Sequence, residues 1–458
     1  MTRPAALFVA ALMIAASTGP LRAQDELGKI DFPTSGAAAA QPAFLKGVLL
    51  MHSFEYDDAK EAFLEAQKAD PGFAMAYWGE AMTYNHAIWQ QTAPELANAA
   101  LARLAPTAEG RRARASTAKE KEWLASLDSL YGASGGSTSL TAGTSTSLSA
   151  SKLSRDRAYA EDLRRMHEKY PQDDEVTAFY ALALLGTSHG GRDFSIYMKA
   201  AALVEQVYAG NPRHPGAAHY LIHAYDDPVH APLGLPFADA FAKIAPSASH
   251  ALHMPSHIYF ALGMWDEASA INERSMKAAD TRRAGKKLDV DARGFHAMQW
   301  LVYGYAQQGR FDEARDLLAQ MEAAAKTSGS VRTRSHLALA RAAWLIESRK
   351  WGEARAPVTA TGLGADAAVA DLFAIGFAAI RSGNRIAGGN ALQEMAALME
   401  EAPTSAGASS AAPATVGKPT AAAARKPSSA ASTTAGITPI VQSQVAQSGA
   451  TGDQRDLK

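Results

Sequence analysis

The chain has no cysteine among its 458 residues. This absence excludes disulfide bonds, thiolate metal sites and cysteine nucleophiles. Any metal ion must therefore be held by nitrogen, oxygen or thioether ligands. Hydrophobic residues make up 47% of the sequence, which is enough to bury a large core.

The chain also lacks an excess of charge of either sign. Its 45 Lys and Arg residues nearly balance its 46 Asp and Glu residues, for a formal net charge of -1. Because nonspecific binding to nucleic acid depends on clustered positive charge, we expect no nucleic-acid partner. A phosphate-binding loop ending in Gly-Lys-Ser/Thr and a His-Glu-x-x-His zinc motif are absent as well.

Residues 1–23 have the pattern of a secretory signal peptide. Arg3 supplies the positive start, an apolar run extends from Ala5 to Ala16, and Ala23 offers a small residue at the cleavage site. That run is shorter than the roughly 20 residues of a membrane-spanning helix. We therefore expect an exported protein, periplasmic or secreted, without stable membrane insertion after cleavage; an uncleaved N-terminal anchor is the alternative.

A 34-residue pattern of small and aromatic residues begins at Ala40, after a predicted N-terminal linker over residues 24–39. Gly47, Tyr56, Ala59, Phe63, Ala66 and Pro71 stand at positions 8, 17, 20, 24, 27 and 32 of this frame. The pattern resembles the tetratricopeptide repeat (TPR), in which small residues let two helices pack closely. The resemblance implies an all-α fold.

Further copies extend the frame along the chain. Clear ones contain Gly263 and Ala268, or Gly309 and Ala314, and a weaker copy contains Trp351. We predict an α-solenoid of about eight or nine TPR-like helix pairs over residues 40–402, forming a right-handed superhelix. A Ser/Thr/Gly-rich stretch at 132–150 predicts a flexible loop, and the Ala/Ser/Thr-rich stretch at 403–458 predicts a disordered tail.

Two histidine pairs stand one repeat apart. His219 and His223 are followed, 34 residues later, by His253 and His257, so both pairs fall at positions 5 and 9 of the frame. Residues four apart lie on one face of a helix, and in the TPR family that face lines the concave groove. The segments that carry these pairs, HYLIHAYDDP and SHALHMPSHIYF, look like a histidine-rich subclass of exported bacterial TPR proteins.

The repeated pairs predict a metal site in the central groove. Two nitrogens one helical turn apart suit a single ion, and two such pairs supply four ligands. His250 and Asp226 fall on the same face and are further candidate ligands. The alternative for Asp226 is to orient an imidazole through its second nitrogen. Imidazole suits zinc, copper, iron and nickel alike, so the predicted cofactor is a transition metal ion of one of these kinds.

Other residues of the same face predict a binding surface for a peptide or protein partner. These candidates are His296, Gln299 and Tyr303 beside the histidines, Trp78 and Met82 in the second repeat, and His52 and His86, again 34 residues apart. An incoming N-terminal segment that buries Trp78 and Met82 is the alternative for that end of the groove.

Three hypotheses follow for function. The leading one is an exported TPR solenoid that binds a transition metal through His219, His223, His253 and His257. The second is a metal-free scaffold that binds peptides or proteins. The third is a metal-dependent enzyme that uses the same site, which requires an open coordination position on the ion.

Overall fold

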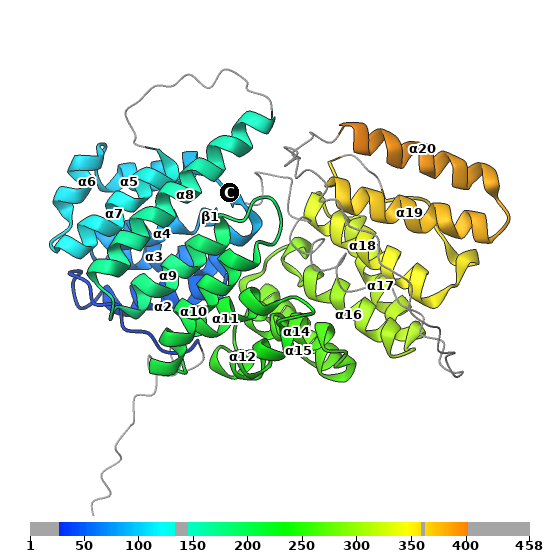
Figure 1. Ribbon diagram of the computed structural model, residues 1–458, viewed down its shortest axis with the longest axis horizontal. Helices are drawn as coiled ribbons and strands as arrows, with labels where there is room; N and C mark the ends of the chain where they lie inside the picture. Colours follow the sequence, from blue (N-terminus) through cyan, green and yellow to red (C-terminus); the bar gives the residue numbers. More distant parts are fainter. Residues whose placement is uncertain (1–26, 133–144, 359–361, 402–458) are drawn as a thin grey trace, which may run out of the picture.

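The computed structural model describes residues 27–132, 145–358 and 362–401. These residues form antiparallel helix pairs stacked side by side, with one hairpin of two-residue strands, so the protein is an all-α solenoid as predicted. The helices curve as an arch, with the N-terminal pairs at one end and α19 and α20 at the other (Figure 1). The predicted signal peptide and C-terminal tail lie outside the described residues.

The first half of the solenoid runs from the first repeat to the start of the histidine-rich region. Its elements are α2 (Gln41–His52), α3 (Tyr56–Ala69), α4 (Ala74–Met82), β1 (Asn85–His86), η1 (Ala87–Trp89), β2 (Gln91–Thr92), α5 (Pro94–Leu104), α6 (Ala108–Arg114), α7 (Ala118–Tyr131), α8 (Ser145–Lys169), α9 (Asp174–Gly186) and α10 (Phe194–Gly210).

The second half contains the predicted site and the C-terminal repeats. Its elements are α11 (Pro215–Tyr225), α12 (Ala231–Ile244), α13 (Ser249–His253), α14 (Pro255–Ala261), α15 (Trp265–Lys286), η2 (Val290–Ala292), α16 (Phe295–Gln307), α17 (Phe311–Ala325), α18 (Val331–Ser348), η3 (Trp351–Glu353), α19 (Ala365–Arg381) and α20 (Arg385–Glu401). No helix in the described ranges is both long and apolar enough to span a bilayer.

Small residues allow the helices to approach closely, as the repeat pattern requires. A Cβ on Gly47 of α2 would stand 2.7 Å from the Phe63 ring, and one on Gly79 of α4 would stand 2.3 Å from the same ring. Phe63 of α3 therefore packs directly on two helix backbones, and it is fully buried. Larger residues at these glycines would push the helices apart.

The prediction that residues 24–39 form a linker is wrong for residues 27–39, because this segment packs into the core. Phe32 is 3% exposed, and its ring lies 5.4 Å from Phe44, 5.7 Å from Trp78 and 5.6 Å from Trp123, centroid to centroid. The backbone N–H of Lys29 donates to the carbonyl of Arg213, 2.9 Å away. An aromatic side chain in an extended segment thus joins the first repeat to later ones.

Two other predictions need correction. The loop predicted for 132–150 is shorter, because α8 already begins at Ser145; residues 133–144 lie outside the description. The weak repeat copy at Trp351 does not form a full second helix but the single 3₁₀ turn η3. Pro357, which lacks an N–H and cannot continue a helix, follows a few residues later.

Ala268 provides a test of the repeat frame. It is fully buried on α15, so Ala268→Leu is expected to overpack its contact with α14 and lower the free energy of unfolding by about 1–3 kcal/mol. Urea denaturation measures the change. The control is Ala270→Leu on the same helix, where the side chain is exposed and little change is expected; equal effects of the two variants would contradict the assigned frame.

Candidate metal centre

The four paired histidines come from α11 and from the α13–α14 segment. His219 and His223 lie one turn apart on α11. His253 ends α13, and His257 lies on α14 after Pro255, whose missing N–H interrupts the helix at Met254. Met254 keeps right-handed helical angles (φ -55°, ψ -37°), so the two side chains still project to one side.

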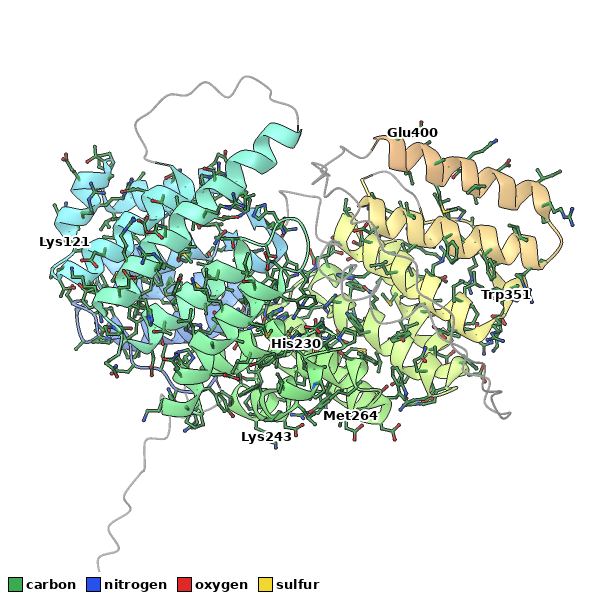
Figure 2. All side chains as sticks on the ribbon, viewed as in Figure 1. Lys121, His230, Lys243, Met264, Trp351 and Glu400 are labelled. Carbon is green, nitrogen blue, oxygen red and sulfur yellow. The ribbon has the colours of Figure 1, made fainter. Side chains whose placement is uncertain are left out.

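Arg192 fixes the end of α11 that carries His223. Its guanidinium donates to the backbone carbonyls of His223 and Ala224, at 3.2 and 2.5 Å, where a helix leaves its last carbonyls unpaired. Its Nε also lies 3.2 Å from Asp227, which accepts from Nδ1 of His230. Figure 2 labels His230 in the middle of the molecule, between the N-terminal and C-terminal helices.

The structure brings the histidines into two groups of three. The first tri-histidine group is His219, His223 and His250, and the second tri-histidine group is His253, His257 and His296. Within each group, one nitrogen from each ring lies within 4.8 Å of the others. The single four-histidine site predicted from sequence is therefore wrong in its grouping, because His250 and His296 complete separate sets.

In the first tri-histidine group, one nitrogen carries a free lone pair and another has no hydrogen-bond partner. His219 Nδ1 lies 2.7 Å from the carbonyl oxygen of His52 and must donate to it, which leaves Nε2 without a proton in the neutral ring. That Nε2 is 3.2 Å from Nε2 of His250. His223 Nε2 is buried and has no hydrogen-bond partner, an arrangement that is costly unless the atom binds something else.

The second tri-histidine group also contains two facing Nε2 atoms, and here the hydrogen-bond partner of each Nδ1 atom is identified. Asn272 donates through Nδ2 to the carbonyl of Ala268, so its oxygen accepts from His253 Nδ1 at 2.6 Å. The Asp226 carboxylate accepts from His257 Nδ1 at 2.9 Å. Both rings therefore present an unprotonated Nε2, and these two atoms lie 3.0 Å apart.

Two lone pairs that face each other at 3.0 Å repel unless a cation lies between them. Burial, and then the neighbouring histidines, hold the pKa of His253 well below its usual range, so a proton on this ring is disfavoured. Burial likewise lowers the pKa of His219 to about 3. Nitrogens bound tetrahedrally to zinc at 2.0–2.1 Å are about 3.3 Å apart, which is close to both observed Nε2 separations.

Of the two roles predicted for Asp226, the structure agrees with the orientation of an imidazole and not with that of a ligand. Its carboxylate is bonded to His257 Nδ1, so it orients the ring instead of standing among the ligand atoms. Burial would raise the pKa of Asp226, but His257 and Arg192 lower it below its usual value. A carboxylate behind a ligating histidine fixes the tautomer and makes the other nitrogen a better donor.

The first repeat covers the first tri-histidine group. The Phe54 ring lies 4.3 Å from His219, 5.7 Å from His223 and 5.5 Å from His250, and Phe54 has a left-handed backbone with φ 55°. Next to it, Glu55 accepts from the backbone N–H of His250 and from Ser249 Oγ, both at 2.9 Å. The turn of the first repeat thus covers the first tri-histidine group, in which His219 and His223 are buried and His250 is partly exposed.

A third group, His52, Glu175 and His214, is completely buried beside α11. His52 Nε2 donates to Glu175 at 2.8 Å and His52 Nδ1 lies 2.8 Å from the Tyr220 hydroxyl. His214 Nδ1 accepts the N–H of Ala217 at the start of α11, and its Nε2 lies 3.2 Å from Glu175. Since every ring nitrogen has a neighbour, we interpret this group as structural.

Several predicted groove residues lie elsewhere. His52 belongs to the buried third group, and Trp78 is completely buried under Phe32, as the alternative of an incoming segment predicted. Met82 is 3% exposed and contacts the Tyr159 hydroxyl. His86 does not approach His52 but stacks on Tyr56, with ring centroids 4.0 Å apart.

The remaining candidates lie beside the second tri-histidine group. Gln299 accepts from Nδ1 of His336 at 2.7 Å, and the His336 ring lies 5.1 Å from His296. Tyr303 is 5% exposed and packs against Phe260. Sequence reasoning missed Asn272, whose partner His253 lies in the same repeat, and Phe54, whose partners lie on later repeats; no local motif marks either residue.

No protein-family model matches this chain, and no curated protein matches it. Solved structures with a similar outline include the human IFIT1 dimer with PPP-AAAA (14% identity, TM-score 0.39, covering 79% of this chain and 73% of that one). Another is the Rap protein complexed with Competence and Sporulation Factor (11%, TM-score 0.38, 80% and 98%). A third is yeast Tom70 (12%, TM-score 0.34, 78% of each chain). Likenesses of this size carry no argument about function.

Proposed function

We propose that this protein is an exported α-solenoid that binds a transition metal ion through buried histidines. The observation that carries the proposal is the facing pair of Nε2 atoms of His253 and His257, 3.0 Å apart, with both Nδ1 atoms committed to acceptors. Neutral imidazoles held in one tautomer are ready to bind an ion without losing protons. The export part of the proposal rests on the signal-like sequence of residues 1–23.

The donor set indicates the chemistry of the ion. Three imidazole nitrogens without thiolate suit zinc, copper, iron or nickel, and disfavour calcium and magnesium, which prefer oxygen. Three protein ligands also leave one position of a tetrahedral ion open, as in catalytic zinc sites, whereas structural sites use four. This open position favours the enzymatic use of the site over a purely structural one.

Binding of a peptide or protein partner is the second candidate function. Burial of four of the six histidines, His219, His223, His253 and His257, removes them from an open recognition surface, so the metal proposal accounts better for their positions. A metal-free scaffold predicts that histidine variants lose a partner while metal ions leave the stability of the protein unchanged.

Metal analysis of the full-length protein, purified without chelator, tests the proposal. We expect bound metal, and we expect added Zn²⁺ at 100 times its dissociation constant to stabilise the apo-protein by about 2.7 kcal/mol. His257→Ala removes one ligand and should weaken Zn²⁺ binding by at least about 100-fold, more than the loss typical of an outer partner.

The matched control is His167→Ala on α8. His167 bonds to Thr177 and lies outside the three histidine groups, so this variant should bind Zn²⁺ like the parent. The proposal fails if the protein carries no metal and its unfolding midpoint does not respond to zinc, copper, iron or nickel ions.

A further inference from the structure

We propose that the chain holds two metal ions, one in each tri-histidine group, so that the site is a pair of neighbouring centres. This inference rests on the proposed function and goes beyond it in the number of ions and in what they bind together. It is carried by the duplication of the donor set and by the unpartnered Nε2 of His223.

Each tri-histidine group is complete as a site for one ion. The first has its facing Nε2 pair in His219 and His250 at 3.2 Å, and the second has its pair in His253 and His257 at 3.0 Å. The third nitrogen of each group lies within 4.8 Å of that pair. A single ion in the first group would leave the His253 and His257 lone pairs facing each other, and a single ion in the second would leave the buried His223 Nε2 without a partner.

The two groups are neighbours through α13 and α11. His250 and His253 are one turn apart on α13, and their ring centroids are 6.2 Å apart. α11 carries His219 and His223 of the first group, and Asp226 at its C-terminus holds His257 of the second. The ions would therefore occupy adjacent positions on consecutive repeats, with their open coordination positions in one region.

The surroundings supply too little negative charge for two divalent ions. All six ligands are neutral imidazoles, and the carboxylates in direct contact with the two groups are Asp226, on His257 Nδ1, and Glu55, on the backbone N–H of His250. Asp227 is engaged by Arg192 and His230. Because uncompensated charge is costly in a buried site, the pair of ions should take up a small anion, such as hydroxide or azide, at the open positions.

The test loads the full-length apo-protein with Zn²⁺ and counts the bound ions per chain by elemental analysis after desalting. We expect two ions in the parent, one in His223→Ala and one in His296→Ala. His223 Nε2 has no hydrogen-bond partner, so removing it leaves no polar group newly unpaired there; because the His223 ring is buried, His223→Gln and a melting curve for each variant separate loss of a ligand from loss of the fold. His167→Ala should retain two ions.

The outcomes separate this inference from the proposed function. One ion in the parent, lost in both variants, overturns the pair but keeps a metal site. No ion in the parent overturns both. Two ions in the parent that are both lost in a single folded variant overturn the assignment of one ion to each group. Azide should bind the Zn²⁺-loaded parent more tightly than either one-ion variant; equal affinity overturns the shared anion position.

Discussion

Replacing Glu175 with alanine is expected to lower the free energy of unfolding by about 3–5 kcal/mol, because it removes the carboxylate from a buried ion-pair network. Burial alone would raise the pKa of Glu175, but His52 and His214 lower it to about 2, so the group is ionised at neutral pH. Without it, the Nε2 atoms of both rings lose their acceptor in a completely buried position.

Urea denaturation of the metal-free protein measures this loss. Glu175→Gln keeps an acceptor oxygen and should cost less than alanine. Glu168→Ala on α8 is the matched control, since Glu168 lies on an exposed surface and pairs only with Arg164; its effect should stay within about 0.5 kcal/mol. If Glu175→Ala behaves like this control, the third histidine group does not support the fold.

Acidification from pH 7 to pH 5 is expected to destabilise the metal-free protein strongly. Burial lowers the pKa of His219 and of His336 to about 3 each, below the value of 6.5 for an unfolded chain. Below pH 6.5 the unfolded chain binds protons that the folded chain does not. The free energy of unfolding is therefore highest above pH 6.5 and decreases as the pH falls toward 3. Each group contributes up to about 1.4 kcal/mol per pH unit.

Melting temperatures measured with a chelator at pH 7, 6 and 5 check this prediction. His336→Gln should make the decline less steep, because glutamine does not titrate while an amide can still pair with Gln299. A melting temperature that does not change between pH 7 and pH 5 would show that the folded chain takes up protons on its histidines as readily as the unfolded chain does.

The helix pairs could be predicted from sequence because their signal is local. Small residues such as Gly47 and Ala268 recur at fixed positions, where neighbouring helices pack closely. Where the local signal was weak, at Trp351, the predicted second helix reduces to η3. The packed position of Phe32 lacked any such signal, because its aromatic partners lie on α2, α4 and α7.

The position of the candidate site could be predicted from sequence, but the separation of its histidines into two groups of three could not. The 34-residue offset places the paired histidines on adjacent helices, and the structure brings them close together. Their division into two groups depends on which nitrogen each ring exposes, and that is set by Asn272 on α15 and by the carbonyl of His52 on α2. The His52 contact joins residues far apart in the chain, and the Asn272 contact depends on a side chain that the repeat pattern does not specify.

The closure of the first repeat over the histidines changes how the solenoid should unfold. Repeat proteins gain stability mainly from neighbouring units and can lose them one at a time. Here Asp58 of α3 pairs with Arg282 and Lys286 of α15, and His52 pairs with Tyr220, so the first repeat is fastened to units four and five steps along the stack. The stretch from α2 to α15 should therefore open as one cooperative block, with slow, long-range folding, while α19 and α20 can fray without exposing the two tri-histidine groups.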